Sequence, residues 1–209
     1  MTENKKGKEA YKYDKIYSRK GVFSKAGFSS TWDNANDFLK NKWDQYGHSV
    51  EGIEYIKDVL HLNPRSIIDI GCGWNEFCQI MKKNGISKAT GLDCSCPGAD
   101  ITASAHDIPI DDKSYDLLVS FDCMEHIPKE EIPLCFQEFS RVSNRIFIKI
   151  CLVDTPTRID GEVLHSCVMP PEWWYNQAEA YFNITGILQK IGGSWPTQYM
   201  IICGQSKEK

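Results

Sequence analysis

The stretch Arg65-Ser66-Ile67-Ile68-Asp69-Ile70-Gly71-Cys72-Gly73 indicates what kind of fold this chain adopts. Its first half is a short, isoleucine-rich run, which is typical of a strand buried on both faces. The two glycines allow a tight turn, and the residues from about Asn75 to Lys83 have the spacing of an amphipathic helix. A strand, a glycine turn and a helix in this order predict a ligand site at the end of a strand in an α/β sheet.

Strand and helix patterns alternate through the rest of the chain. Further strands are predicted at 88–92, 115–121 and 145–152, with a helix at 130–142. This alternation predicts a mostly parallel sheet with helices on both faces, the doubly wound α/β arrangement. The last two predicted strands, 182–189 and 198–203, are too close in sequence for a crossover helix between them. They are therefore expected to run antiparallel, so that the sheet ends with an antiparallel terminal strand.

The segment before the first strand differs in charge from the rest. Residues 1–25 carry a net charge of +5, whereas the whole chain carries −4 and the remainder therefore −9. Apolar residues at helical spacing predict helices at 32–46 and 50–60. We predict that 1–62 is an N-terminal arm with helices and that 63–209 is one globular domain. The arm is expected to act as a lid over the ligand site or as a solvated tail.

Composition narrows the class of protein. A chain of 209 residues with 42% hydrophobic and 25% charged residues suits a single globular domain. No apolar run is long enough to cross a membrane, and the start MTENKKGKEA lacks the apolar core of a secretory signal. The odd count of nine cysteines suggests reduced thiols and a cytoplasmic location. Cys94 and Cys96 are one isolated C-x-C pair, a weak zinc signal, so no metal site is expected.

Carboxylates at the predicted strand ends narrow the choice of ligand. Asp93 ends the second strand, where a carboxylate can accept hydrogen bonds from ribose hydroxyls, and Asp107 is the next acidic candidate. Together they indicate an adenosine-containing cofactor. Glu76 stands where a dinucleotide-binding G-x-G-x-x-G motif has its third glycine, and its charge would repel a pyrophosphate. The sequence therefore favours the sulfonium cofactor S-adenosylmethionine over NAD.

Four blocks of the sequence, taken in order, resemble the motifs of class I S-adenosylmethionine-dependent methyltransferases, most closely the small-molecule "type 11" group. They are IIDIGCGWNEF (67–77), TGLDCS (90–95), AHDIPIDDKSYDLLVSFDCMEHIP (105–128) and RIFIKIC (145–151). The resemblance covers roughly residues 60–204. It implies a Rossmann-like fold with a seven-stranded sheet, and methyl transfer that leaves S-adenosylhomocysteine as product.

The same resemblance implies roles for individual residues. The methionine end of the cofactor would be held by Asp69, Gly71 and Gly73, with Phe121 and Asp122 beside it. The ribose would bind to Asp93, and the adenine edge would lie against Asp107 and Ile108. The cofactor site would be completed by Cys72 and Cys94. The sequence departs from the family pattern at Trp74-Asn75, where the third residue of the glycine loop is often small.

Two histidines are candidates for a general base. His126, in Glu125-His126-Ile127-Pro128, follows the strand at 115–121, near the expected position of the methyl group. His165 follows the strand at 145–152 and a polar loop, in the region expected to form the acceptor wall. A neutral imidazole can take a proton from the acceptor. Either histidine is equally suited to hold the acceptor without proton transfer.

Several function classes are disfavoured. The residues after the strand at 115–121 are Phe121-Asp122-Cys123-Met124, not the [DNS]-P-P-[YF] turn that holds an extruded base, and the net charge is acidic. Ribose or terminal-group methylation of RNA stays open. We predict a methyltransferase acting on an oxygen or nitrogen of a small polar molecule, for example a sugar. The alternatives are a nicotinamide-dependent oxidoreductase and a non-catalytic cofactor-binding protein. Oligomeric state is not specified by the sequence.

Overall fold

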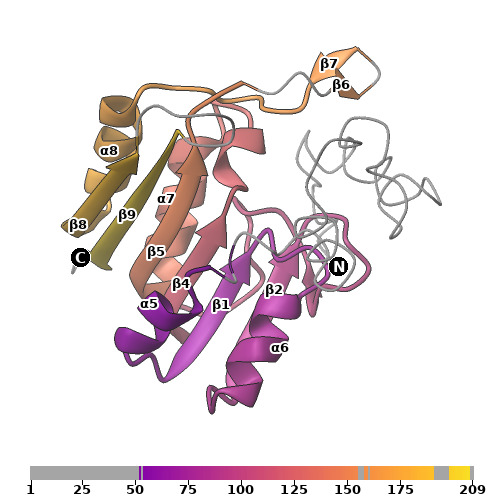
Figure 1. The fold of residues 1–209 in the computed structure, drawn as a ribbon, viewed down its shortest axis with the longest axis vertical. Helices are drawn as coiled ribbons and strands as arrows, with labels where there is room; N and C mark the ends of the chain where they lie inside the picture. Colours follow the sequence, from indigo (N-terminus) through magenta and orange to yellow (C-terminus); the bar gives the residue numbers. More distant parts are fainter. Residues whose placement is uncertain (1–51, 53, 155–157, 160, 191–197, 208–209) are drawn as a thin grey trace.

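A seven-stranded sheet forms the centre of the molecule (Figure 1). The computed structural model describes residues 52, 54–154, 158–159, 161–190 and 198–207. The strands follow the order β3-β2-β1-β4-β5-β9-β8 across the sheet. Their bounds are β1 (Ser66–Ile70), β2 (Lys88–Asp93), β3 (Ile101–Thr102), β4 (Tyr115–Phe121), β5 (Ser143–Cys151), β8 (Phe182–Lys190) and β9 (Tyr199–Ser206).

Strand direction confirms the predicted Rossmann-like sheet. The pairs β1–β2, β1–β4, β2–β3 and β4–β5 are parallel, whereas β9 is antiparallel to both of its neighbours, β5 and β8. The predicted antiparallel terminal strand is therefore β9, and it lies inside the sheet between β5 and β8. Within the sheet, β3 was not predicted, because two residues are too few to show an alternating pattern; the same holds for the two-residue strands at 158–159 and 162–163 outside the sheet.

Helices cover both faces of this sheet. They are α5 (Ile56–His61), α6 (Glu76–Lys83), the 3-10 turn η2 (Met124–His126), α7 (Ile132–Val142) and α8 (Pro171–Glu179). A small hairpin of β6 (Arg158–Ile159) and β7 (Glu162–Val163) lies outside the sheet (Figure 1). Proline stands in the first turn of both α7 and α8, where its missing N–H has no helical partner to lose. Among the described residues, no helix is long and apolar enough to cross a membrane.

Two hydrophobic clusters pack on opposite faces of the sheet. Successive side chains of a strand point to opposite faces, so Ile67 belongs to the cluster of α5 and α6 whereas Ile68 belongs to the cluster of α7 and α8. Trp174 of α8 is fully buried in the second cluster. Burying a large apolar side chain stabilises the fold by about 1.5–3 kcal/mol. Packing on both faces thus holds the carboxyl ends of the parallel strands in one row.

The N-terminal predictions are only partly covered by the structure. The predicted helix at 50–60 corresponds to α5, which packs against the sheet through the buried Val59. The helix predicted at 32–46 and the basic segment 1–25 lie outside the described residues. Their assignment as a lid or a tail, and the domain division at residue 62, stay predictions.

Candidate functional site

The turn after β1 consists largely of residues with a left-handed backbone. The angle φ is +76° at Gly71, +51° at Gly73 and +66° at Asn75. A β-carbon at Gly71 would overlap with the side chain of Cys123, so glycine is needed there for both conformation and space. Asn75 is one of the few non-glycine residues that adopt this conformation readily. This explains how asparagine occupies a position where the family often has a small residue.

The N–H groups of this turn are bonded within the protein. Gly71 and Cys72 donate to the carbonyl oxygen of Leu92 at 2.8 and 3.1 Å. Gly73 donates to Oδ2 of Asp93 at 3.1 Å. A turn that binds a pyrophosphate must direct several of its N–H groups at the ligand. These three N–H groups already have protein acceptors, so the turn is poorly suited to a dinucleotide.

Asp93 is fixed at the end of β2 by backbone groups. Its Oδ1 accepts hydrogen bonds from the N–H groups of Ser95 at 2.9 Å and Cys96 at 2.8 Å, while its Oδ2 accepts the bond from Gly73. Burial raises the pKa of Asp93, and these three N–H groups oppose that rise. An ionised carboxylate can accept about four hydrogen bonds. Acceptor capacity therefore remains for a ribose hydroxyl, which fits the predicted role.

Two further acids make the same turn electronegative. Asp69 of β1 is only 2% exposed. Burial raises the pKa of Asp69 well above its usual range, and the nearby carboxylates of Asp93 and Glu76 raise it further. Additional negative charge in this place would be strongly unfavourable, whereas positive charge would be favoured. The turn therefore suits a ligand with an ammonium and a sulfonium group better than one with phosphates.

The predicted adenine edge lies in the loop between β3 and β4. The backbone N–H of the buried Ile108 donates to Oε2 of Glu138 at 2.9 Å, and its carbonyl oxygen accepts a bond from Arg141 at 2.8 Å. Asp107 is exposed, and its N–H donates to the carbonyl oxygen of Ser104 at 3.1 Å. Helix α7 thus anchors the loop at Ile108 and leaves the neighbouring carboxylate accessible.

Phe121 and Asp122, at the end of β4, lie in different environments. The ring of Phe121 stacks on Tyr55, with 5.8 Å between centroids, and also contacts Phe77. Asp122 has a left-handed φ of +44° and forms an ion pair with the buried Lys149 of β5. Phe121 is therefore part of the hydrophobic cluster of α5 and α6, whereas Asp122 belongs with the polar residues at the tips of β4 and β5.

The structure brings the two candidate histidines into contact. The rings of His126 and His165 meet edge to face, with 4.7 Å between centroids. Nδ1 of His126 lies 3.1 Å from the carbonyl oxygen of Leu164, and Nδ1 of His165 lies 2.7 Å from that of Val153. With the proton on Nδ1, as these carbonyl partners require, the basic nitrogen of each ring is Nε2. Burial lowers the pKa of His165, so its ring is neutral near pH 7.

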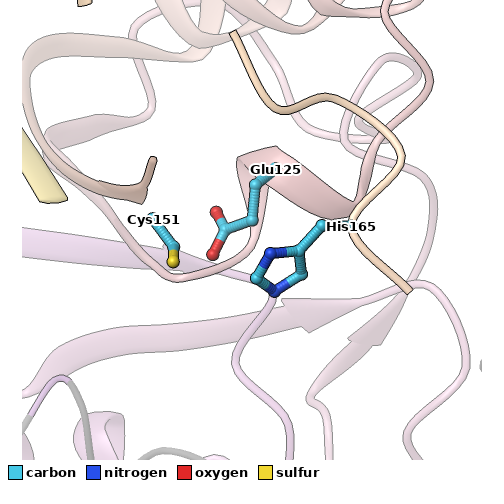
Figure 2. A group of neighbouring side chains, drawn as sticks. All are labelled: Glu125, Cys151 and His165. Carbon is cyan, nitrogen blue, oxygen red and sulfur yellow. The ribbon is translucent and has the colours of Figure 1, made fainter. Parts of the chain in front are cut away.

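Two residues beside these histidines were missed by the sequence analysis. Glu125 of η2 is fully buried; neither carboxylate oxygen has a hydrogen bond of good geometry, although the backbone N–H groups of Glu125 and Cys151 are near enough to lower its pKa. Cys151 is the last residue of β5 and is also buried. Figure 2 shows the carboxylate of Glu125 between the thiol of Cys151 and the ring of His165, and one donor atom from each of the three residues lies within 4.8 Å of the others. The signals available in the sequence were that Glu125 precedes His126 and that Cys151 lies at the end of the strand predicted at 145–152.

Comparison with known proteins identifies the family. Residues 41–181 match the model of a family described as a methyltransferase domain, which is more than half of the chain. The chain belongs to this methyltransferase family. No curated protein matches the sequence.

Solved structures share the fold at low sequence identity. Magnesium protoporphyrin IX methyltransferase from Synechocystis PCC 6803, solved with S-adenosylhomocysteine, has a TM-score of 0.63 at 10% identity, covering 95% of this chain and 100% of that one. The 1,6-didemethyltoxoflavin-N1-methyltransferase of Burkholderia thailandensis, also solved with S-adenosylhomocysteine, has a TM-score of 0.59 at 12% identity, covering 87% and 88%. A protein from Pyrococcus horikoshii OT3 gives 0.61 at 14%, covering 92% and 99%. By family and fold, this methyltransferase is of the class I, S-adenosylmethionine-dependent type.

Proposed function

We propose that this methyltransferase acts on an oxygen or nitrogen of a small polar acceptor, for example a sugar, and that the acceptor binds beyond the tips of β4 and β5. The observation that supports this proposal is the contact between His126 and His165, which brings two imidazoles together after β4, where Cys123 packs against Gly71 of the glycine turn. The buried Glu125 and the ion pair of Lys149 with Asp122 make the same region polar. A polar pocket suits a polar acceptor, because each buried polar group needs a partner.

The cofactor site is proposed from the residues around the glycine turn. S-adenosylmethionine, when bound, supplies a methyl group that its positively charged sulfur has already activated. Asp69 and Glu76 would favour the positive charge of such a ligand, and Asp93 would accept a ribose hydroxyl. Gly71 and Gly73 allow the backbone to approach the ligand closely, and the exposed Asp107 with Ile108 would border the adenine.

The histidine pair is proposed to handle the acceptor. A neutral imidazole can accept the proton of an acceptor hydroxyl or amine, which contributes typically 10²–10⁴-fold to a rate. His165 is neutral near pH 7 because burial lowers its pKa. Where the acceptor has no proton to lose, the same residues would align it and exclude water, which can supply much of the catalysis.

Other parts of the proposal concern acceptor size and cell compartment. The titles of two structural neighbours name heterocyclic acceptors, 1,6-didemethyltoxoflavin and magnesium protoporphyrin IX. For this chain we propose a smaller polar acceptor, with segment 1–25 either closing over it as a lid or forming a solvated tail. None of the nine cysteines forms a disulfide, which supports a reducing, cytoplasmic location.

The test begins with calorimetric titration of the full-length protein with S-adenosylmethionine, S-adenosylhomocysteine and NAD. Both sulfur compounds are expected to bind and NAD is not, because of the acids around the turn. Failure of both sulfur compounds to bind would reject the cofactor site. Transfer of a labelled methyl group to a panel of sugars, amines and RNA ends then identifies the acceptor class. Cofactor binding without transfer to any acceptor would favour the non-catalytic alternative.

Single replacements separate the two roles of the histidines. If either acts as the base, His126→Asn or His165→Asn lowers kcat by about 10²-fold or more while the affinity for S-adenosylmethionine is retained. A change confined to the KM of the acceptor would indicate positioning. Near-normal turnover of both variants would show that neither is an essential base.

A further inference from the structure

The cluster of Glu125, Cys151 and His165 lies at the carboxyl ends of β4 and β5 (Figure 2). Glu125 comes from η2 after β4, Cys151 ends β5, and His165 follows the β6–β7 hairpin. Three segments that are distant in sequence thus bring a carboxylate, a thiol and an imidazole to within 4.8 Å of one another. These are three of the side-chain types that bind transition metals in proteins.

Glu125 is the strongest indication that the cluster has a ligand. A buried carboxylate is costly unless it is neutralised, paired or well hydrogen-bonded. Burial and the charge of Asp122 raise the pKa of Glu125 well above its usual range, and the backbone N–H groups of Glu125 and Cys151 and the charge of Lys149 oppose this rise only in part. Lys149 is itself committed to the ion pair with Asp122. A cation bound between Glu125 and its neighbours would remove this cost.

The other two side chains are arranged as zinc ligands are. His165 donates its Nδ1 proton to the carbonyl oxygen of Val153 at 2.7 Å, which fixes the ring in the tautomer with a lone pair on Nε2. Histidines that bind metals commonly give their other N–H to a backbone carbonyl in this way. The thiol of Cys151 donates its proton to the same carbonyl oxygen, with Sγ 3.7 Å from that oxygen.

We propose that Glu125, Cys151 and His165 bind a zinc ion. Zinc takes thiolate, imidazole and carboxylate donors at about 2.0–2.3 Å in tetrahedral geometry, which separates the donors by about 3.5 Å. Donors within 4.8 Å of one another reach that geometry by small side-chain adjustments. The charges also balance, because Zn²⁺ with one thiolate and one carboxylate is neutral. Cys151 releases its proton when the ion binds.

Three protein ligands leave a fourth position open, as in catalytic zinc sites. His126 is in edge-to-face contact with His165, so we expect the open position to face the proposed acceptor region. This role rests on the proposed function, with His126 as the remaining base candidate because Nε2 of His165 binds the zinc: an acceptor hydroxyl bound to zinc loses its proton at a lower pH than in water. The site would thereby direct methylation to the oxygen of a hydroxyl-bearing acceptor.

Metal binding is tested on the full-length protein after removal of metals with a chelator. Zinc titration against a chromophoric competitor is expected to give one tight equivalent per chain. Co²⁺ in place of zinc is expected to give the visible bands of a tetrahedral site and a thiolate charge-transfer band. Cys151→Ser is expected to abolish the charge-transfer band and to weaken zinc binding by about 100-fold or more.

Control variants distinguish this site from adventitious binding by other thiols. Cys203→Ser changes a half-buried cysteine of β9 outside the cluster, and Cys94→Ser breaks the isolated C-x-C pair. Both are expected to keep the zinc affinity and the cobalt spectrum. If either control loses binding as Cys151→Ser does, or if zinc binds in less than one equivalent, the proposal is overturned.

Glu125→Gln provides a second test of zinc binding at this cluster, in case Cys151→Ser fails to fold. It keeps the side-chain volume and removes the buried charge, so the metal-free variant is expected to melt at the same or a higher temperature than the metal-free parent. Zinc is expected to raise the melting temperature of the parent but not of the variant. Equal stabilisation of both by zinc overturns the proposal. S-adenosylmethionine binding without zinc binding rejects only the metal site, whereas zinc binding without methyl transfer rejects only the proposed activity.

Discussion

The two ends of the parallel strands differ in how their acidic side chains are placed: at the amino end the acids are paired with arginines, whereas at the carboxyl end two acids are buried near other carboxylates. At the amino end, Arg145 donates to Asp116 at 2.9 Å and to the carbonyl oxygen of Leu62, and Arg141 binds Glu138 of its own helix at 2.7 Å. The cavity of about 710 Å³ at this end is bordered by several of these paired side chains. At the carboxyl end, Asp69 and Glu125 are buried among other carboxylates.

The direction of the pKa shifts expresses this difference. Hydrogen bonds and the charge of Arg141 hold the pKa of Glu138 below its usual range despite partial burial, so its ionised form stabilises the fold. The pKa values of Asp69 and Glu125 are raised, so their ionised forms destabilise the ligand-free protein. Strongly perturbed carboxylates cluster at functional sites. The difference is what we expect if the amino end contributes to stability and the carboxyl end forms the proposed binding site.

The largest expected effect is that of Gly71→Ala. A β-carbon there meets the side chain of Cys123 and is strained by the left-handed backbone, so we expect a loss of about 3 kcal/mol or more in the free energy of unfolding. Urea denaturation measures it. Gly85→Ala is the matched control, since Gly85 also has a positive φ but has nothing within 4 Å of its β-carbon. It is expected to cost about 1 kcal/mol. An equal loss in free energy of unfolding for Gly71→Ala and Gly85→Ala would contradict the close packing of Gly71 against Cys123 in the turn after β1.

The next effect concerns cofactor affinity. In Asp93→Asn, the amide group faces the three backbone N–H groups that donate to the carboxylate in the parent protein, so its NH₂ cannot replace an acceptor oxygen. The substitution also removes one negative charge. We expect S-adenosylmethionine to bind about 100-fold more weakly, equivalent to about 2.7 kcal/mol. Calorimetric titration measures the change. Asp116→Asn, at the amino end, should leave the affinity within about twofold. A comparable loss in both variants would break the distinction between the two ends.

A smaller effect is expected from Arg145→Met. The variant loses the hydrogen bonds to Asp116 and to the carbonyl oxygen of Leu62 but keeps an apolar stem. We expect the free energy of unfolding to fall by about 1–2 kcal/mol, with cofactor affinity unchanged. Thermal and urea unfolding measure the first quantity, and titration measures the second. A loss of affinity without a loss of stability would show that the amino end also shapes the site.

The smallest effect is a dependence of cofactor affinity on pH. The folded-state pKa of Asp69 is above its unfolded value, so ligand-free stability falls as pH rises between the two. A positively charged ligand favours the ionised carboxylate, so the affinity for S-adenosylmethionine should rise over the same interval, by at most about tenfold per pH unit. Titrations in buffers of different ionisation enthalpy should show proton release on binding. Asp69→Asn should remove both dependences; their persistence would assign them to another group.

Much of the sheet could be predicted because β1, β4 and β5 are apolar runs buried on both faces, and because such runs end at turn residues. The turn after β1 could be predicted for the same reason, since Gly71, Gly73 and Asp93 lie at fixed places relative to two strands; the role of these residues in cofactor binding stays a prediction. The contact between His126 and His165 could not, because it depends on the path of the chain through the β6–β7 hairpin. Local periodicity carries no information on such long-range contacts.

The position of β9 has a consequence for how the chain folds. The strands β4 and β5 are separated in sequence only by η2 and α7, so they can pair once both have been synthesised. The other edge of β5 pairs with β9, which comes after the β6–β7 hairpin, α8 and β8 in the sequence. Closing the sheet is therefore a late, long-range event, and such pairings are intrinsically slow. Until then the apolar edge of β5 can pair with another molecule. During synthesis, this protein is most vulnerable to aggregation before its last strand has been inserted.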